Sequence, residues 1–198
     1  DEAKAAKKFL KKCTSAEDWA KYAYQHDLPY CVCKTDILRV ESYIRKELIK
    51  DKLSVSFLDE YQRVFMIYVF KREPNGQYFC IGIMFWEFEE GKSGDNDDLK
   101  SWIYTFETNG HVEVIARETG SDEECVWKSK RPLNVESNWE PIPDFGNWEG
   151  LMKMERWQEG ELSELFKSPE IDTKEDKKQA PKPNRQPGST WSLLDDED

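Results

Sequence analysis

The sequence predicts an α+β domain, in which N-terminal helices pack on a curved, mainly antiparallel meander sheet of about five strands and a C-terminal aromatic extension follows. Three observations predict it: two adjacent strongly apolar segments at residues 61–70 and 78–88, a helical stripe at residues 36–50, and short connections between successive strand-like segments. With 198 residues, the chain has room for one domain of about 150 residues plus extensions.

The segments 61–70 and 78–88 are apolar at both odd and even positions. An antiparallel hairpin with one face in water would instead alternate apolar and polar residues. Asn75 and Gly76 lie in the connection and favour a turn. We therefore expect the two segments to form the middle of a sheet that is covered on both sides.

Three helices are predicted before the sheet. The first spans residues 1–10, and the second begins at the capping-box pattern formed by Thr14 and Glu17. The third spans residues 36–50, where an apolar stripe recurs at helical spacing at Ile37, Val40, Ile44 and Leu48. We expect this third helix to cover one face of the sheet.

Three further strands are predicted after the central hairpin. Residues 102–107 alternate apolar and polar side chains, Asn109 and Gly110 give a tight-turn signal, and residues 111–117 return as the next strand. Residues 125–128 form the last. Such short connections favour an antiparallel meander.

The chain is predicted to have four parts: a helical part at 1–52, the antiparallel sheet at 53–137, an extended aromatic and short-helix segment packed on the sheet at 138–166, and a flexible, proline-rich acidic tail at 167–198. Two prolines hold residues 138–149 extended. In the tail, an aromatic residue and two leucines precede four acidic residues, which is typical of a docking peptide. The predicted partner-binding residues are Trp139, Phe145, Trp148, Trp157, Trp191, Leu193 and Leu194.

Residues 142–149 carry the pattern Pro-x-Phe-Gly-x-Trp, with Pro143, Phe145, Gly146 and Trp148 at its fixed positions. This pattern resembles the core of the plant nitrate-induced domain, an interaction motif of immune scaffolds. The resemblance covers eight residues, and the tyrosine- and phenylalanine-bearing continuation of that family is absent after Glu149. It implies a plant source and assigns no functional residue.

The charge is uneven along the chain. The formal net charge is -11; residues 1–52 carry 12 basic and 9 acidic side chains, a net of +3, which leaves -14 on residues 53–198. An acidic body repels phosphates, which argues against direct nucleic-acid binding, and it suits protein partners with basic surfaces. No apolar run reaches the length of a membrane span.

No catalytic, cofactor-binding or metal-binding residues are predicted. The two histidines, His26 and His111, offer few combinations for a hydrolase, and no glycine-rich phosphate loop or dinucleotide motif is present. Cys31 and Cys33 could join Cys13 and His26 in a metal cluster, but matched cysteine pairs are missing and reduced thiols are the better interpretation.

Five cysteines without a regular disulfide spacing indicate a reducing intracellular compartment. A first residue other than Met would fit a plastid stroma or another organelle after removal of a targeting segment, and the cytoplasm or nucleus are the alternatives.

The predicted function is a non-catalytic interaction or scaffold subunit of a larger assembly, docking through its C-terminal extension, with organellar or nuclear gene-expression machinery as one setting. Two alternatives stay open. One is an acidic, immunity-type inhibitor of a basic toxin or nuclease, and the other is an enzyme or small-ligand binder with a cavity between helices and sheet.

Overall fold

The computed structural model describes residues 8–9, 11, 15–35, 39–46, 51–91, 98–121 and 123–156. These residues form nine strands and one α-helix, so the predicted arrangement of several helices on a five-stranded sheet is wrong. The elements are α2 (Ala16–Gln25), β1 (Tyr30–Thr35), β2 (Val40–Lys46), β3 (Lys52–Leu58), β4 (Val64–Arg72), β5 (Gln77–Phe88), β6 (Asp98–Phe106), β7 (Val112–Glu118), β8 (Glu124–Lys128), the 3-10 turn η1 (Glu136–Asn138) and β9 (Trp139–Pro141).

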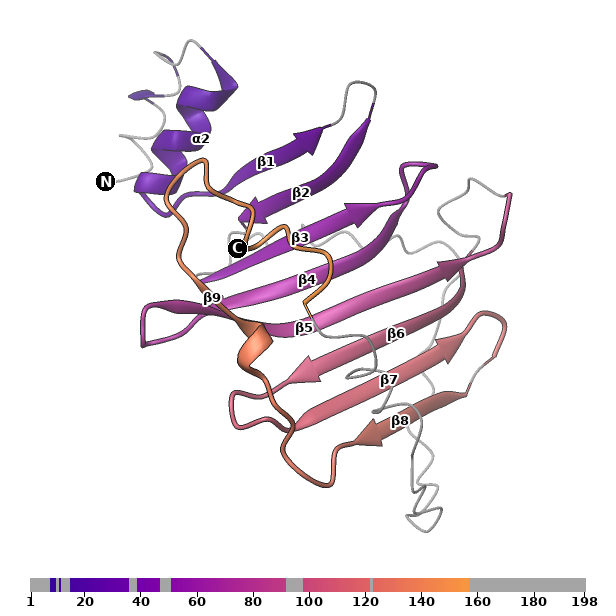
Figure 1. The fold of residues 1–198 in the computed structure, drawn as a ribbon. Helices are drawn as coiled ribbons and strands as arrows, with labels where there is room; N and C mark the ends of the chain where they lie inside the picture. The colour runs from indigo at the N-terminus through magenta and orange to yellow at the C-terminus, as the bar shows by residue number, and fades with distance from the viewer. Residues whose placement is uncertain are drawn as a thin grey trace, which may run out of the picture.

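The first eight strands form one antiparallel meander in chain order, from β1 at one edge to β8 at the other (Figure 1). The ninth strand breaks this order. β9 pairs with the first residues of β5, with Trp139 opposite Phe79, on the side where β6 pairs only from Gly82 onward. The chain after β8 is thereby tied to the middle of the sheet.

The predicted third helix is replaced by a strand. Val40–Lys46 is β2, paired with β1 on one side and β3 on the other, while Ile37 and Leu48 of the expected stripe lie outside the described residues. Ser42, Ile44 and Lys46 are buried, and the residues between them are more exposed. Burial that alternates every second residue is typical of a strand. As a strand, this segment forms backbone hydrogen bonds with β1 and β3, and that pairing outweighs a helical stripe of few apolar residues.

The structure confirms the predicted second helix, five of the predicted strands and two turns. The second helix is confirmed as α2, with Ser15 rather than Thr14 at its N-cap, where its hydroxyl accepts a 3.1 Å hydrogen bond from the Asp18 amide. β4 to β8 appear where strands were expected, and the two predicted turn glycines, Gly76 and Gly110, adopt positive φ. The predicted first helix lies almost entirely outside the described residues.

Strand register divides the side chains between two faces. Residues directly opposite each other on antiparallel strands point to the same face. One cross-strand row is buried throughout and defines the inner face: Ile44, Val55, Tyr68, Ile83, Tyr104 and Val114. The hydrophobic core lies on this face, and α2 joins it through Ala20 and Ala23.

Candidate functional site

The inner face is closed by residues 133–156, which we call the strap. In Figure 1 the strap runs across the sheet from the β8 end to α2 and then turns back over the central strands. It begins where the Leu133 amide donates a 2.9 Å hydrogen bond to the Gly110 carbonyl in the β6–β7 turn. Its apolar side chains from Leu133 to Met152 pack on the core. The strap therefore takes the covering role that was expected of a helix on one face.

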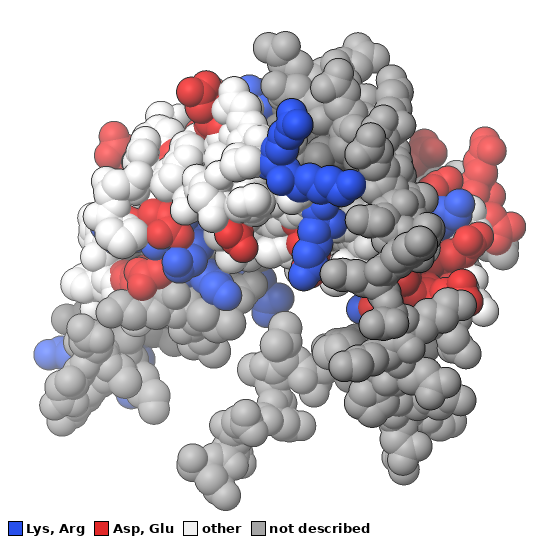
Figure 2. Space-filling view, turned by 90° about the horizontal axis from the view of Figure 1, so that it is seen from below, with Lys and Arg blue, Asp and Glu red and all other residues white. Residues whose placement is uncertain are grey.

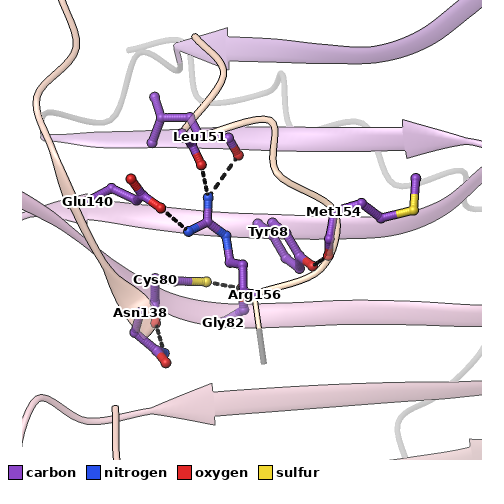
Figure 3. A network of polar contacts seen from close by, with 9 residues as sticks. Tyr68, Cys80, Gly82, Asn138, Glu140, Leu151, Met154 and Arg156 are labelled. Atoms are coloured by element: carbon purple, nitrogen blue, oxygen red, sulfur yellow. Dashed lines mark hydrogen bonds and ion pairs between the residues drawn. The ribbon is translucent and has the colours of Figure 1, made fainter. Parts of the chain in front are cut away.

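Arg156 fastens the returning end of the strap (Figure 3). Its side chain is 0% exposed, and its Nη1 lies 2.6 Å from Glu140 Oε1 in an ion pair. Nη2 donates hydrogen bonds to the carbonyls of Gly150 and Leu151, at 2.5 and 3.0 Å. The guanidinium also lies over the ring of Phe70, 4.8 Å from its centroid. Because the charged guanidinium is fully buried, removal of its ion-pair partner would leave an uncompensated charge inside the protein.

Hydrogen bonds between the sheet and the strap hold the strap in place. The Tyr68 hydroxyl donates a hydrogen bond to the Met154 carbonyl, and the Asn138 amide donates one of 2.8 Å to the Cys80 carbonyl (Figure 3). Burial raises the pKa of the Tyr68 hydroxyl above its usual range and that of the Cys80 thiol to about 12. Both groups are neutral at physiological pH and serve structure here.

Three of the predicted partner-binding residues are built into this cover. Trp148 is buried, Phe145 packs against it with ring centroids 5.6 Å apart, and Trp139 lies 4.7 Å from the Phe79 ring. The Tyr24 hydroxyl of α2 donates a hydrogen bond to the Pro143 carbonyl. These aromatic residues contact their own domain, and contact of their exposed parts with a partner stays a prediction. Trp157, Trp191, Leu193 and Leu194 lie outside the described residues.

The opposite face carries a second cross-strand row, which sequence reasoning did not find. Its members stand directly opposite one another from β2 to β8 and define the outer row: Tyr43, Ser56, Ile67, Met84, Ile103, Ile115 and Val126. Ser56 is buried, Val126 is 51% exposed, and the rest are half-buried. None of them belongs to the core or packs against it. Among the described elements outside the meander, α2 contacts β1 while η1 and β9 contact β5, and none contacts the other strands of the row closely.

The flanks of the outer row are polar. On β7 and β8, Arg117 pairs with Glu124 and Lys128 pairs with Glu113, each at 2.7 Å, so the two ion pairs bracket Ile115 and Val126. Apolar side chains bordered by charged ones are the usual make-up of a protein-binding surface.

Acidic side chains gather at one end of the sheet, where β5 and β7 end and β6 and β8 begin. The group comprises Glu87, Glu89, Glu90, Asp98, Glu118, Glu123 and Glu124, all exposed except the half-buried Asp98. Figure 2 views the molecule from the β8 side and shows a group of acidic side chains at its right end, while acidic side chains also lie on the left, some of them beside basic ones. This acidic end borders the outer row and would attract a basic rim on a partner.

The two histidines considered for chemistry lie in different parts of the fold. His26 ends α2, and His111 follows the β6–β7 turn with its backbone amide bonded to the Asn109 side chain. Among the described residues, no group of three or more His, Cys, Asp or Glu side chains could hold a metal ion. The helix that the structure describes is too short and too polar to cross a membrane.

Comparison with known proteins identifies no relative: no family model, curated protein or solved structure matches this chain.

Proposed function

We propose that this protein is a non-catalytic interaction subunit that binds another protein through the outer face of its sheet. The outer row is the observation that carries the proposal. It is a continuous line of largely apolar side chains across seven strands, lying apart from the core on a face that the strap leaves open. A row of apolar side chains of this length on an open face promotes aggregation unless a binding partner covers it.

The size of the face supports this role. The seven strands of the outer row, spaced about 4.8 Å apart, make a face about 34 Å wide, and about 20 Å along the strands gives roughly 700 Å². That area falls within the range of one partner's share of a standard stable interface, about 600–1,000 Å².

The charges favour a partner of definite chemistry. The ion pairs Arg117–Glu124 and Glu113–Lys128 neutralise the flanks of the row, while the other carboxylates at the acidic end of the sheet leave negative charge along one border. The matching surface is an apolar patch of a second protein, bordered on one side by lysine and arginine. Such an arrangement speeds association at low salt and fixes orientation.

The test places one charge in the centre of the outer row. The variants Ile103→Lys and Ile115→Lys are compared with Thr108→Lys, which adds the same charge in the exposed β6–β7 turn. The partner is captured from the native source with the full chain, identified and purified, and its Kd is measured by calorimetry at two salt concentrations. We expect the row variants to raise the Kd by roughly 30-fold or more, as for a hot-spot residue, and Thr108→Lys to leave it unchanged.

Two further outcomes are decisive. Unchanged Kd values for both row variants, with near-ultraviolet circular dichroism showing a folded protein, would contradict the use of this face. A variant truncated after Phe166 separates the outer face from the predicted docking residues Trp191, Leu193 and Leu194. If that variant alone loses the partner, the tail rather than the sheet forms the interface.

A further inference from the structure

Two thiols lie side by side at one edge of the sheet. Cys31 and Cys33 are both exposed and lie two residues apart on β1, which pairs with β2 and with no other described strand. In register they stand opposite Arg45 and Tyr43, so both point to the outer face. The two side chains are within hydrogen-bonding reach of each other. Chain geometry alone thus makes a solvent-accessible dithiol.

The strand geometry suits a bridging ion better than a disulfide. Residues two apart on a strand have Cα and Cβ atoms about 6.6 Å apart, whereas a disulfide needs Cβ atoms about 3.8 Å apart. Two metal–sulfur bonds of about 2.3 Å in a line place the sulfur atoms about 4.6 Å apart. Side chains that lean toward each other from an undistorted strand reach that separation.

The surroundings favour a soft ion of low coordination number. The described residues place no group of three or more potential metal ligands around this pair, as a four-coordinate zinc site would require. Thiolates select soft ions, and Cu(I) is satisfied by two of them. A Cu(I) dithiolate carries one negative charge, and the guanidinium of Arg45, opposite Cys31, is placed to offset it.

We propose that Cys31 and Cys33 form a two-thiolate site for one Cu(I) ion. On binding, both S–H bonds break, two Cu–S bonds form and two protons leave to solvent, so no electrons are transferred. The site is independent of the protein-binding proposal, because it uses side chains of the edge strand and leaves the central part of the outer row untouched.

The experiment is an anaerobic titration of the reduced full chain with Cu(I), in competition with bicinchoninate. Cys31→Ser and Cys33→Ser are compared with Cys125→Ser, which removes a single exposed thiol from the opposite edge strand β8. We expect the wild type and Cys125→Ser to bind one ion per chain with equal affinity. Cys31→Ser and Cys33→Ser should each lose about 100-fold or more, because the second thiolate then no longer acts as an intramolecular ligand.

A smaller effect checks the role of charge. Arg45→Gln should weaken Cu(I) binding several-fold without changing its stoichiometry. The proposal is overturned if Cys31→Ser and Cys33→Ser bind as tightly as Cys125→Ser, or if mass spectrometry of the air-free protein finds a Cys31–Cys33 disulfide. Urea unfolding of each metal-free variant shows that affinities are compared between folded proteins.

Discussion

The two faces of the central strands are built from neighbouring residues but differ in burial. On β4, Tyr68 is 1% exposed beneath the strap, whereas the adjacent Ile67 is half-buried in the outer row. The same contrast holds for Ile83 and Met84 on β5. Apolar character is similar on both faces, so hydrophobicity alone does not tell a core residue from a contact residue. The strap makes the difference, because it covers one face and is held there by buried polar groups.

The largest expected effect tests how firmly the strap is held. Glu140→Ala leaves the Arg156 guanidinium buried without its ion-pair partner, and we expect it to lower the free energy of unfolding by about 3–5 kcal/mol. Glu124→Ala, which breaks the exposed pair with Arg117 beside the outer row, should cost less than about 1 kcal/mol. Urea unfolding of both variants measures the comparison. Equal losses of unfolding free energy in the two variants would mean that the buried Glu140–Arg156 pair stabilises the fold no more than an exposed ion pair does.

A medium effect is expected where the strap begins. Gly110 has φ of +90°, and a Cβ added there would lie 2.5 Å from the Leu133 carbonyl oxygen, which is backbone and cannot move aside alone. Gly110→Ala should therefore lower the free energy of unfolding by more than the roughly 1–2 kcal/mol of the left-handed backbone alone. Gly76→Ala is the matched control, since its φ is +79° and a Cβ there meets nothing within 4 Å. Thermal unfolding that shifts equally in both variants would show that the Leu133 contact is dispensable.

The smallest effect is a pH dependence of the inner face. Burial raises the pKa of the Cys80 thiol from its ordinary value of 9.0 to about 12, so the folded state holds its proton where the unfolded chain releases it. The resulting stability is complete below about pH 9 and is lost as the pH rises toward 12. Cys80→Ala should flatten the fall in unfolding free energy between about pH 8 and pH 10, and the difference between the two proteins isolates the thiol, because the buried tyrosines that begin to ionise in the unfolded chain near pH 10 are common to both. If the unfolding free energy of Cys80→Ala, measured by chemical unfolding, fell with pH as steeply as that of the wild type, Cys80 would not contribute to the pH dependence.

The sequence predicted the part of the fold in which local signals agree. Two apolar runs, turn glycines at 76 and 110 and an alternating return strand identify β4 to β8. β2 was missed because Val40 and Ile44 satisfy a helical spacing as well as a strand, and only pairing with β1 and β3 separates the two. The strap was expected to fold over the sheet, yet Arg156 gave no signal, because a lone arginine near a tryptophan is typical of a surface residue.

The candidate binding surface was harder still to predict. Each member of the outer row is an ordinary residue within its own strand, and the row exists only because the strand registers place Ile67, Met84, Ile103 and Ile115 opposite one another. A signal was present in the doubly apolar character of the central hairpin. It could not reveal which of the two faces would be covered.

The sequence by itself determined the antiparallel centre of this protein, its turns and its acidic character, because these depend on residues close together in the chain. Tertiary structure decided which face became core. The free energy that selects the inner face comes from contacts between residues far apart, such as Glu140 with Arg156 across the strap and Tyr68 with Met154 between sheet and strap. Such contacts depend on register and chain reversal, and no local pattern encodes them.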